Sequence, residues 1–291
     1  MVETQHQRHR RHCTPTHARQ RAISLALGVF RTFDAASELD LRIAFLESAL
    51  VHTGKTGYVL GISGGVDSLV AGKLAQLAVR RLRDRGRHAF FVAVRLPYGL
   101  QHDEQDAALA VDFIAPDHCI QVDIKMAVDA QREALSASGL LIADLAVEDF
   151  IVGNMKVRQR MLAQYAIAAA QDSLVIGTDQ AAEALMGFFT KHGDGAADLV
   201  PLRGLTKRRV RALGILLGAP AKLITKVPTA DLESLQPLRP DEDAFGVTYD
   251  EIDDFLEGLG VRPEAVEIIL KQYDATAHKR GEPAAPIRPS G

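Results

Sequence analysis

Apolar and polar positions follow two periods along this chain, and the changes of period mark its elements. Short apolar runs typical of strands lie at residues 58–62, 88–96, 119–124 and 174–177. Apolar residues at the three- and four-residue spacing of amphipathic helices predict helices near residues 16–33, 35–51, 66–82, 103–114, 126–138 and 154–170. Strands separated by helices predict an α/β protein with a doubly wound parallel sheet and flanking helices.

The first apolar strand runs directly into the turn Ser63-Gly64-Gly65-Val66-Asp67-Ser68, and a helix follows. Glycines at such a turn let backbone N–H groups approach an anion, and the helix start adds the positive end of its dipole. The carboxylate of Asp67 would repel a bound phosphate unless a hard cation such as Mg²⁺ lay between them. The turn therefore predicts a site for Mg²⁺ with a nucleotide or pyrophosphate. The alternative is a tight connection in which Ser63 caps the helix and no ligand binds.

A second glycine-bearing segment, Ala49 to Thr56, fits a relaxed phosphate-loop pattern in the wrong context. Such a loop follows a strand and opens a helix. Here residues 39–51 have the pattern of a helix, and the strand comes after the segment. Gly54 is therefore expected to end that helix as part of a C-cap and turn.

Length and composition indicate one large domain and give little support to nucleic-acid binding or a membrane span. The chain has 291 residues, 47% of them hydrophobic, which suits one large domain over residues 22–291. The net charge of −3 gives no argument for nucleic acid, and no segment is long and apolar enough to span a bilayer. Residues 1–21, rich in Arg and His, are expected to form a disordered basic tail; an interaction arm or a metal site is the alternative. Only Cys13 and Cys119 are present, so a reducing cytoplasm is expected.

A second polar region begins where the last strand ends. Ligands of doubly wound sheets bind at the carboxyl ends of the strands. Three segments are therefore expected at one edge of the sheet: residues 63–68, 95–101 and 177–183. Glu183 lies one turn into a short helix there, where its carboxylate could share the cation held by Asp67. Alternatively, Thr178 or Asp179 caps that helix and Glu183 is simply an acid favoured by the helix dipole.

From about Leu39 to Arg280 the chain resembles the ammonia-dependent NAD⁺ synthetases, within the ATP pyrophosphatases that share the turn at 63–68. The matching segments occur in order: Leu96 to Gly99, Gly153-Asn154, Ala163 to Ala166, Gly177 to Asp179, Gly187 to Lys191, Gly193 to Gly195, Pro201-Leu202, Gly204 to Lys207, Pro228 to Leu232, Tyr249 to Asp253 and His278-Lys279. The resemblance implies a Rossmann-like fold related to the adenine nucleotide alpha hydrolases. It also implies that ATP adenylates the nicotinate carboxylate of deamido-NAD⁺ with release of pyrophosphate, and that ammonia then displaces AMP.

The same resemblance implies which residues bind each substrate. ATP would be bound by Gly61, Ile62, Ser63, Gly64, Gly65, Val66, Asp67, Ser68, Thr178, Lys207 and Thr229. Deamido-NAD⁺ would be bound by Arg158, Lys191, Asp198, His278 and Lys279, and Mg²⁺ by Asp67 and Glu183. Arg95 is a weaker candidate near the nucleotide. Without the resemblance, Arg158 would belong to a basic solvated helix face with Lys156 and Arg160. A homodimer is also implied, with the dinucleotide site near the subunit interface.

The chain departs from the family's pattern at three places. Val66 stands where Gln is common, Gln180 where His is common, and Leu185-Met186 where Val-Thr is common. The principal charged positions are intact, so these departures concern fine contacts.

Two further expectations concern the nitrogen donor and a mobile segment. Only 57 residues precede the first strand, whereas glutamine-using synthetases carry an added N-terminal amidase domain, so ammonia is the expected donor. The long loop Thr225 to Thr248 is expected to order over ATP as a lid. Two other functions fit the turn alone: another ATP pyrophosphatase with a different acceptor, and a non-catalytic ATP-binding protein of the same fold.

Overall fold

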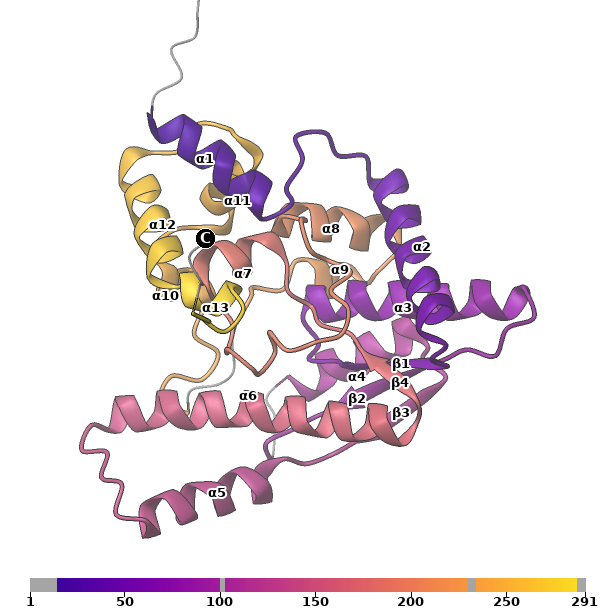
Figure 1. Cartoon of the computed structure of the whole chain (residues 1–291), viewed down its shortest axis with the longest axis horizontal. Coiled ribbons are helices and arrows are strands. Elements are labelled where there is room, and N and C mark those ends of the chain that lie inside the picture. The colour runs from indigo at the N-terminus through magenta and orange to yellow at the C-terminus, as the bar shows by residue number, and fades with distance from the viewer. Residues whose placement is uncertain (1–14, 100–102, 230–233, 287–291) are drawn as a thin grey trace, which may run out of the picture.

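The computed structural model describes residues 15–99, 103–229 and 234–286, and in them four parallel strands form one sheet (Figure 1). The strands are β1 (Gly57–Gly61), β2 (Phe90–Arg95), β3 (His118–Gln121) and β4 (Ser173–Val175), in the order β3-β2-β1-β4. The order reverses at β1, because the chain moves outward to β3 and then returns to β4 on the other side. The predicted doubly wound parallel sheet is confirmed.

Helices cover both faces of this sheet. On one side lie α2 (Ala35–Thr53), α3 (Val66–Asp84) and α8 (Lys207–Leu216), which pack on each other; on the other lie α5 (Lys125–Ala137) and α6 (Leu145–Ala170). The remaining helices are α1 (Pro15–Ala26), α4 (Glu104–Ile114), α7 (Ala181–Met186), α9 (Ala221–Ile224), α10 (Asp241–Phe245), α11 (Tyr249–Glu257), α12 (Pro263–Ala275) and α13 (Ala277–Arg280). No helix in the described part of the chain could cross a membrane.

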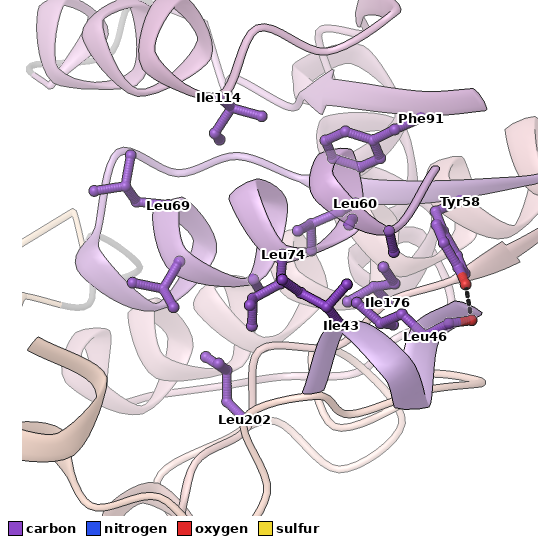
Figure 2. Packing of buried hydrophobic residues seen from close by; sticks show 14 of the residues in the cluster. Ile43, Leu46, Tyr58, Leu60, Leu69, Leu74, Phe91, Ile114, Ile176 and Leu202 are labelled. Carbon is purple, nitrogen blue, oxygen red and sulfur yellow. Dashed lines mark hydrogen bonds between the residues drawn. The ribbon is translucent and has the colours of Figure 1, made fainter. Parts of the chain in front are cut away.

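Alternation along β1 explains why the sheet has two cores. Successive side chains of a strand point to opposite faces. Tyr58 and Leu60 pack with α2 and α3 in the larger core (Figure 2), whereas Val59 packs with residues of α5 and α6. The hydroxyl of Tyr58 donates to the carbonyl of Leu46 in α2, so this buried polar group has a partner. Both faces of β1 are thus buried, which holds its carboxyl end in place.

A third core joins helices from distant parts of the chain. Ile23 of α1, Phe255 of α11 and Ile269 of α12 belong to it, together with residues of α7. Because α1 starts at Pro15, residues 15–21 are helical and the expected disordered tail is wrong for them. Residues 1–14 lie outside the described residues. Leu185 and Met186, which depart from the family's pattern, are buried in this core.

Two loop predictions have different outcomes. Gly54 ends α2 in the left-handed conformation, with φ of 72°, so the expected C-cap is confirmed. The segment 225–248 was expected as one loop, but α10 forms within it because Asp241 and Glu242 favour a helix start and Gly246 ends the turn at φ of 71°. Residues 230–233 of that segment lie outside the described residues.

Candidate functional site

A cavity of about 400 Å³ opens at the carboxyl ends of β1 and β4. Its walls come from the turn after β1, from α6 and α7, and from residues at the start of α8 and after α9. Twelve residues expected to bind substrates or metal line it: Gly61, Ile62, Ser63, Gly65, Val66, Asp67, Ser68, Thr178, Glu183, Lys207, Thr229 and Lys279. The segments 63–68 and 177–183 therefore meet at the sheet edge, as expected.

The turn after β1 is held from both sides. The side-chain oxygen of Gln164 in α6 accepts a hydrogen bond from the N–H of Gly61 at 2.7 Å. Gly64 has φ of 84°, and a Cβ there would lie 2.7 Å from the backbone nitrogen of Ala107 in α4. Only glycine combines that conformation with that close approach.

Helix α3 starts without a side-chain cap. Its N-cap is Gly65, and within the described residues no side chain caps it. The alternative in which Ser63 caps the helix is wrong, because its hydroxyl lies 3.2 Å from that of Ser68 and accepts from the N–H of Gly65 within the turn. Uncapped N–H groups at the start of a 19-residue helix suit a bound anion.

Lys207 and Asp67 form a buried ion pair at this turn. The ammonium nitrogen lies 2.5 Å from Oδ2 of Asp67, and the two side chains are 3% and 13% exposed. Burial opposes a charge on Lys207, but the carboxylates of Asp67 and Glu183 outweigh burial and raise its pKa. The pKa of Glu183 is also raised, first by burial and then by Asp67. One buried cation therefore lies beside two carboxyl groups, and its pairing with Asp67 offsets the cost of burying both charges.

Helix α7 is capped by a different residue from the one that the sequence suggested. Gln180 caps α7 by accepting from the N–H of Ala182 at 2.6 Å, and Glu183 accepts from the N–H of Gln180 at 3.3 Å. Thr178 and Asp179 are not the cap, so that alternative is wrong in its cap residue, although Glu183 is a first-turn acid. Gln180 also departs from the family's pattern, where His is common. Its side chain caps α7, which gives the glutamine a structural role at this position.

The donor set at Asp67 fits Mg²⁺. Its Oδ1 is buried and has no hydrogen-bond partner in the described residues, and Glu183 faces the same cavity. The described residues contain no group of three or more side chains that could hold a metal. Mg²⁺ typically binds one or two carboxylates and takes its other ligands from phosphates and water. Two carboxylates beside a phosphate turn match that preference.

Two further acids lie in this region without an expected role. Asp194 lines the cavity and accepts from the N–H of Thr190 at 2.7 Å; the surrounding walls exclude enough water to raise its pKa. Burial raises the pKa of Asp179 to about 7, and repulsion from Asp194 and Asp67 adds to it. Both belong to segments that match the family, Gly177 to Asp179 and Gly193 to Gly195. The signal that could have identified them is an acid within one or two residues of a glycine in a segment that matches the family.

Four residues expected at deamido-NAD⁺ do not line the cavity: Arg158, Lys191, Asp198 and His278. The guanidinium of Arg158, on the outside of α6, donates to the carbonyl of Lys191 at 3.3 Å. Asp198 accepts from the N–H of Val175 at 2.7 Å, at the edge of β4. His278 is exposed on α13. Their expected roles stay predictions.

The basic residues of α6 differ in their surroundings. Lys156 is 5% exposed and donates to Ser234 at 3.1 Å, while Arg160 lines the cavity and donates to the carbonyl of Leu96. A solvated basic face is thus wrong for these two residues and right for Arg158. Arg95 pairs with Glu104 and does not line the cavity. Lys226 lines the cavity unexpectedly and pairs with Asp103 at 3.3 Å.

Comparison with known proteins gives one consistent family. The model of the family described as NAD synthase matches residues 38–283. A curated relative from Burkholderia pseudomallei (strain 1106a), named NH(3)-dependent NAD(+) synthetase, is 57% identical over 266 residues, which are 91% of this chain and 94% of the relative. The crystal structure of an NAD+ synthetase from the same species has a TM-score of 0.81 at 54% identity, covering 92% and 98% of the two chains. An NMN synthetase from Francisella tularensis has a TM-score of 0.75 at 35% identity, covering 88% and 99%.

Proposed function

Because this chain belongs to the NAD synthase family, we propose that its cavity carries out the ammonia-dependent step that completes NAD⁺. The enzyme is a ligase that forms a C–N bond: ATP and ammonia convert deamido-NAD⁺ to NAD⁺, AMP and pyrophosphate through an NAD-adenylate. The observation that carries this function is the meeting of Lys207, Asp67 and Glu183 at the phosphate turn.

In the first step, a nicotinate carboxylate oxygen attacks the α-phosphorus of ATP. The new P–O bond forms as the bond to the β-phosphate breaks, and both electrons of that bond leave with pyrophosphate. The uncapped start of α3 and the hydroxyls of Ser63 and Ser68 receive the departing group. Lys207 neutralises charge that grows on it. Asp67 and Glu183 would hold Mg²⁺, which supplies further positive charge when bound.

In the second step, ammonia attacks the carbonyl carbon of the adenylate. AMP leaves with the carboxylate oxygen, and the nitrogen gives up a proton to form the neutral amide. Asp194 suits the proton-accepting role because it lines the cavity and its pKa is raised.

The second substrate would extend from the cavity over α6, where Arg158 and Lys191 lie together. Exposed apolar side chains also gather on α5, α6 and their connection: Met126, Leu135, Leu140, Leu141, Leu145, Val147, Phe150 and Leu162. Apolar side chains in such number favour burial against another protein surface. A homodimer formed through these helices would place the dinucleotide next to the partner subunit.

The cellular setting and the lid belong to the same proposal. Cys119 is a free, exposed cysteine, which suits a reducing cytoplasm. Val227, Pro228 and Thr229 border the cavity at the start of the expected lid. Closure of this segment over bound ATP would exclude water from the adenylate.

An end-point assay tests the function. The protein is incubated with deamido-NAD⁺, Mg²⁺ and ATP, with either ammonium or glutamine as nitrogen donor. Ammonium is expected to give equal amounts of NAD⁺, AMP and pyrophosphate, and glutamine none above its ammonium contamination. Because one similar structure is an NMN synthetase, nicotinate mononucleotide is supplied as a competing acceptor. Preferred amidation of that mononucleotide would assign the chain to the other acceptor.

A further inference from the structure

Helix α8 begins with Lys207, and the residue before it does not cap the helix. Its N-cap is Thr206, and no side-chain cap bond is formed by that residue. The hydroxyl of Thr206 instead donates to Oε1 of Glu257 in α11, at 2.8 Å. The first N–H groups of α8 therefore need acceptors from elsewhere.

Asp253 of α11 supplies those acceptors. Its Oδ1 accepts from the N–H of Lys207 at 3.1 Å and its Oδ2 from the N–H of Arg208 at 2.7 Å. The carboxylate is 1% exposed, so both bonds lie in a dry environment. A negative charge at this end of a helix also interacts favourably with the helix dipole. Two helices far apart in sequence are thus joined at the residue whose side chain enters the site.

Three residues on one stripe of α11 contact the start of α8. Tyr249, Asp253 and Glu257 are four residues apart, which places them on one face of the helix. The ring of Tyr249 lies 4.9 Å from the ammonium nitrogen of Lys207, and Glu257 pairs with Arg209 at 3.0 Å. The stripe therefore contacts Lys207 through both its backbone and its side chain.

We propose that Asp253 is a positioning residue, which fixes the start of α8 so that Lys207 reaches Asp67 and the phosphates of ATP. The importance of this contact rests on the proposed function. Lys207 meets its partner at 2.5 Å inside a buried site. A small shift of the helix start would separate the charges, and misplacement by an ångström is costly in such sites.

A double-mutant cycle on ATP affinity tests whether Asp253 acts through Lys207. The variants are D253N, K207M and the double substitution, and the dissociation constant of Mg-ATP is measured by calorimetry. D253N keeps the size of the side chain but replaces one accepting oxygen with an amide N–H₂ group. One of the two backbone N–H groups then loses its acceptor. We expect it to weaken ATP binding about tenfold in the wild type and less than about twofold in K207M. Equal weakening in both backgrounds would overturn the proposal.

The matched control is D254N, on the same helix. Asp254 pairs with the side chain of Arg208 at 2.7 Å and is a third exposed. Its carboxylate accepts from that side chain, whereas the backbone N–H groups of Lys207 and Arg208 donate to Asp253, so replacing Asp254 is expected to leave ATP affinity within about twofold. An effect of D254N on ATP affinity as large as that of D253N would mean that any charge change on α11 weakens binding, and would contradict a specific role for Asp253.

A chemical measurement separates this proposal from the function itself. Lys207 is 3% exposed, and Lys156 is buried to a similar extent in another part of the fold. Labelling with an amine-reactive reagent, followed by peptide mass spectrometry, is expected to rise about tenfold at Lys207 in D253N while Lys156 stays protected. This result needs no turnover, so it stands even if the assigned acceptor is wrong. Labelling that rises at both lysines, or at neither, contradicts a positioning role. If D253N does not fold, E257Q weakens the same stripe and takes its place.

Discussion

The ammonium nitrogen of Lys207 lies 2.5 Å from Oδ2 of Asp67, although 140 positions separate the two residues. Asp67 stands in the first turn of α3, and Lys207 is the first residue of α8. The pair is buried, so neither charge is tolerated without the other. A metal and a polyphosphate would enter a site in which one cation already pairs with Asp67 and lies near the carboxyl group of Glu183.

Replacing Lys207 with Met is expected to lower the free energy of unfolding by about 3 kcal/mol at neutral pH, because Asp67 and Glu183 lose their cation. Mg²⁺ should restore part of this loss in K207M and have a smaller effect on the wild type. Urea unfolding with and without Mg²⁺ measures both. K271M removes an exposed lysine of α12 and serves as the control. A loss in K207M that Mg²⁺ leaves unchanged would speak against a metal site at these carboxylates.

Replacing Asp67 with Asn removes a charge that the proposed metal site needs. We expect the rate of AMP release at saturating substrates to fall at least about 100-fold. D84N neutralises an exposed carboxylate at the other end of the same helix and should keep the wild-type rate. The quantity to compare is AMP formed per active site per second. Near-normal turnover in D67N would rule out this carboxylate as a metal ligand.

Gly64 and Gly86 both have positive φ, 84° and 77°, but differ in their surroundings. A Cβ at Gly64 would meet the backbone of α4, whereas a Cβ at Gly86 has nothing within 4 Å. G86A should therefore cost about 1 kcal/mol of unfolding free energy from backbone strain alone. G64A adds a clash with backbone and should cost about 3 kcal/mol or more. Equal costs in denaturant unfolding would mean that the turn after β1 does not press against α4.

The stability of the protein should depend on pH through Asp253. Burial raises its pKa from 3.8 to about 6, although the N–H groups of Arg208 and Lys207 and the charge of Arg208 oppose the rise, and Glu257 adds to it. A folded-state pKa above the unfolded value means that the stabilisation is present at low pH and is lost as pH rises through 6. D253N cannot titrate. The unfolding free energy of D253N minus that of the wild type should therefore be about 2 kcal/mol more positive at pH 7.5 than at pH 4.5. A pH-independent difference would contradict this pKa.

The proposed dimer can be tested at its most exposed apolar residue. Leu141, between α5 and α6, is 91% exposed, and L141D would place a charge in the interface. We expect the dimer to dissociate at micromolar concentration in light-scattering measurements. L216D introduces the same charge at an exposed apolar position of α8 and should stay dimeric. A monomeric wild type would contradict the proposed dimer. Dissociation by L216D but not by L141D would mean that the interface lies elsewhere.

Local sequence predicted the parts of the site that local structure determines. The turn at 63–68 was found because a buried strand, two glycines and a helix start occur within one short segment. Contacts between distant segments were not predictable in the same way. The pairing of Lys207 with Asp67, and the cap that Asp253 gives α8, depend on how whole helices pack.

Burial also changed the meaning of residues whose pattern looked ordinary. Lys156 and Arg160 follow the spacing of a solvated basic face, yet one is buried and the other lines the cavity, because loop segments cover this part of α6. Asp194 stands between two glycines, and its sequence segment was given no role of its own. Its position in the cavity comes from the packing of residues 187–199 against the end of β4, which no local pattern encodes.

Transfer of oxygen tests the adenylation most directly. Deamido-NAD⁺ labelled with ¹⁸O in its nicotinate carboxylate is converted with ATP, Mg²⁺ and ammonium, and the products are analysed by mass spectrometry. Attack of the carboxylate on the α-phosphorus predicts one ¹⁸O atom in the phosphate of each AMP and none in pyrophosphate. Unlabelled AMP, or formation of ADP with labelled inorganic phosphate, would contradict the adenylate and with it the role given to the turn at Ser63 to Ser68.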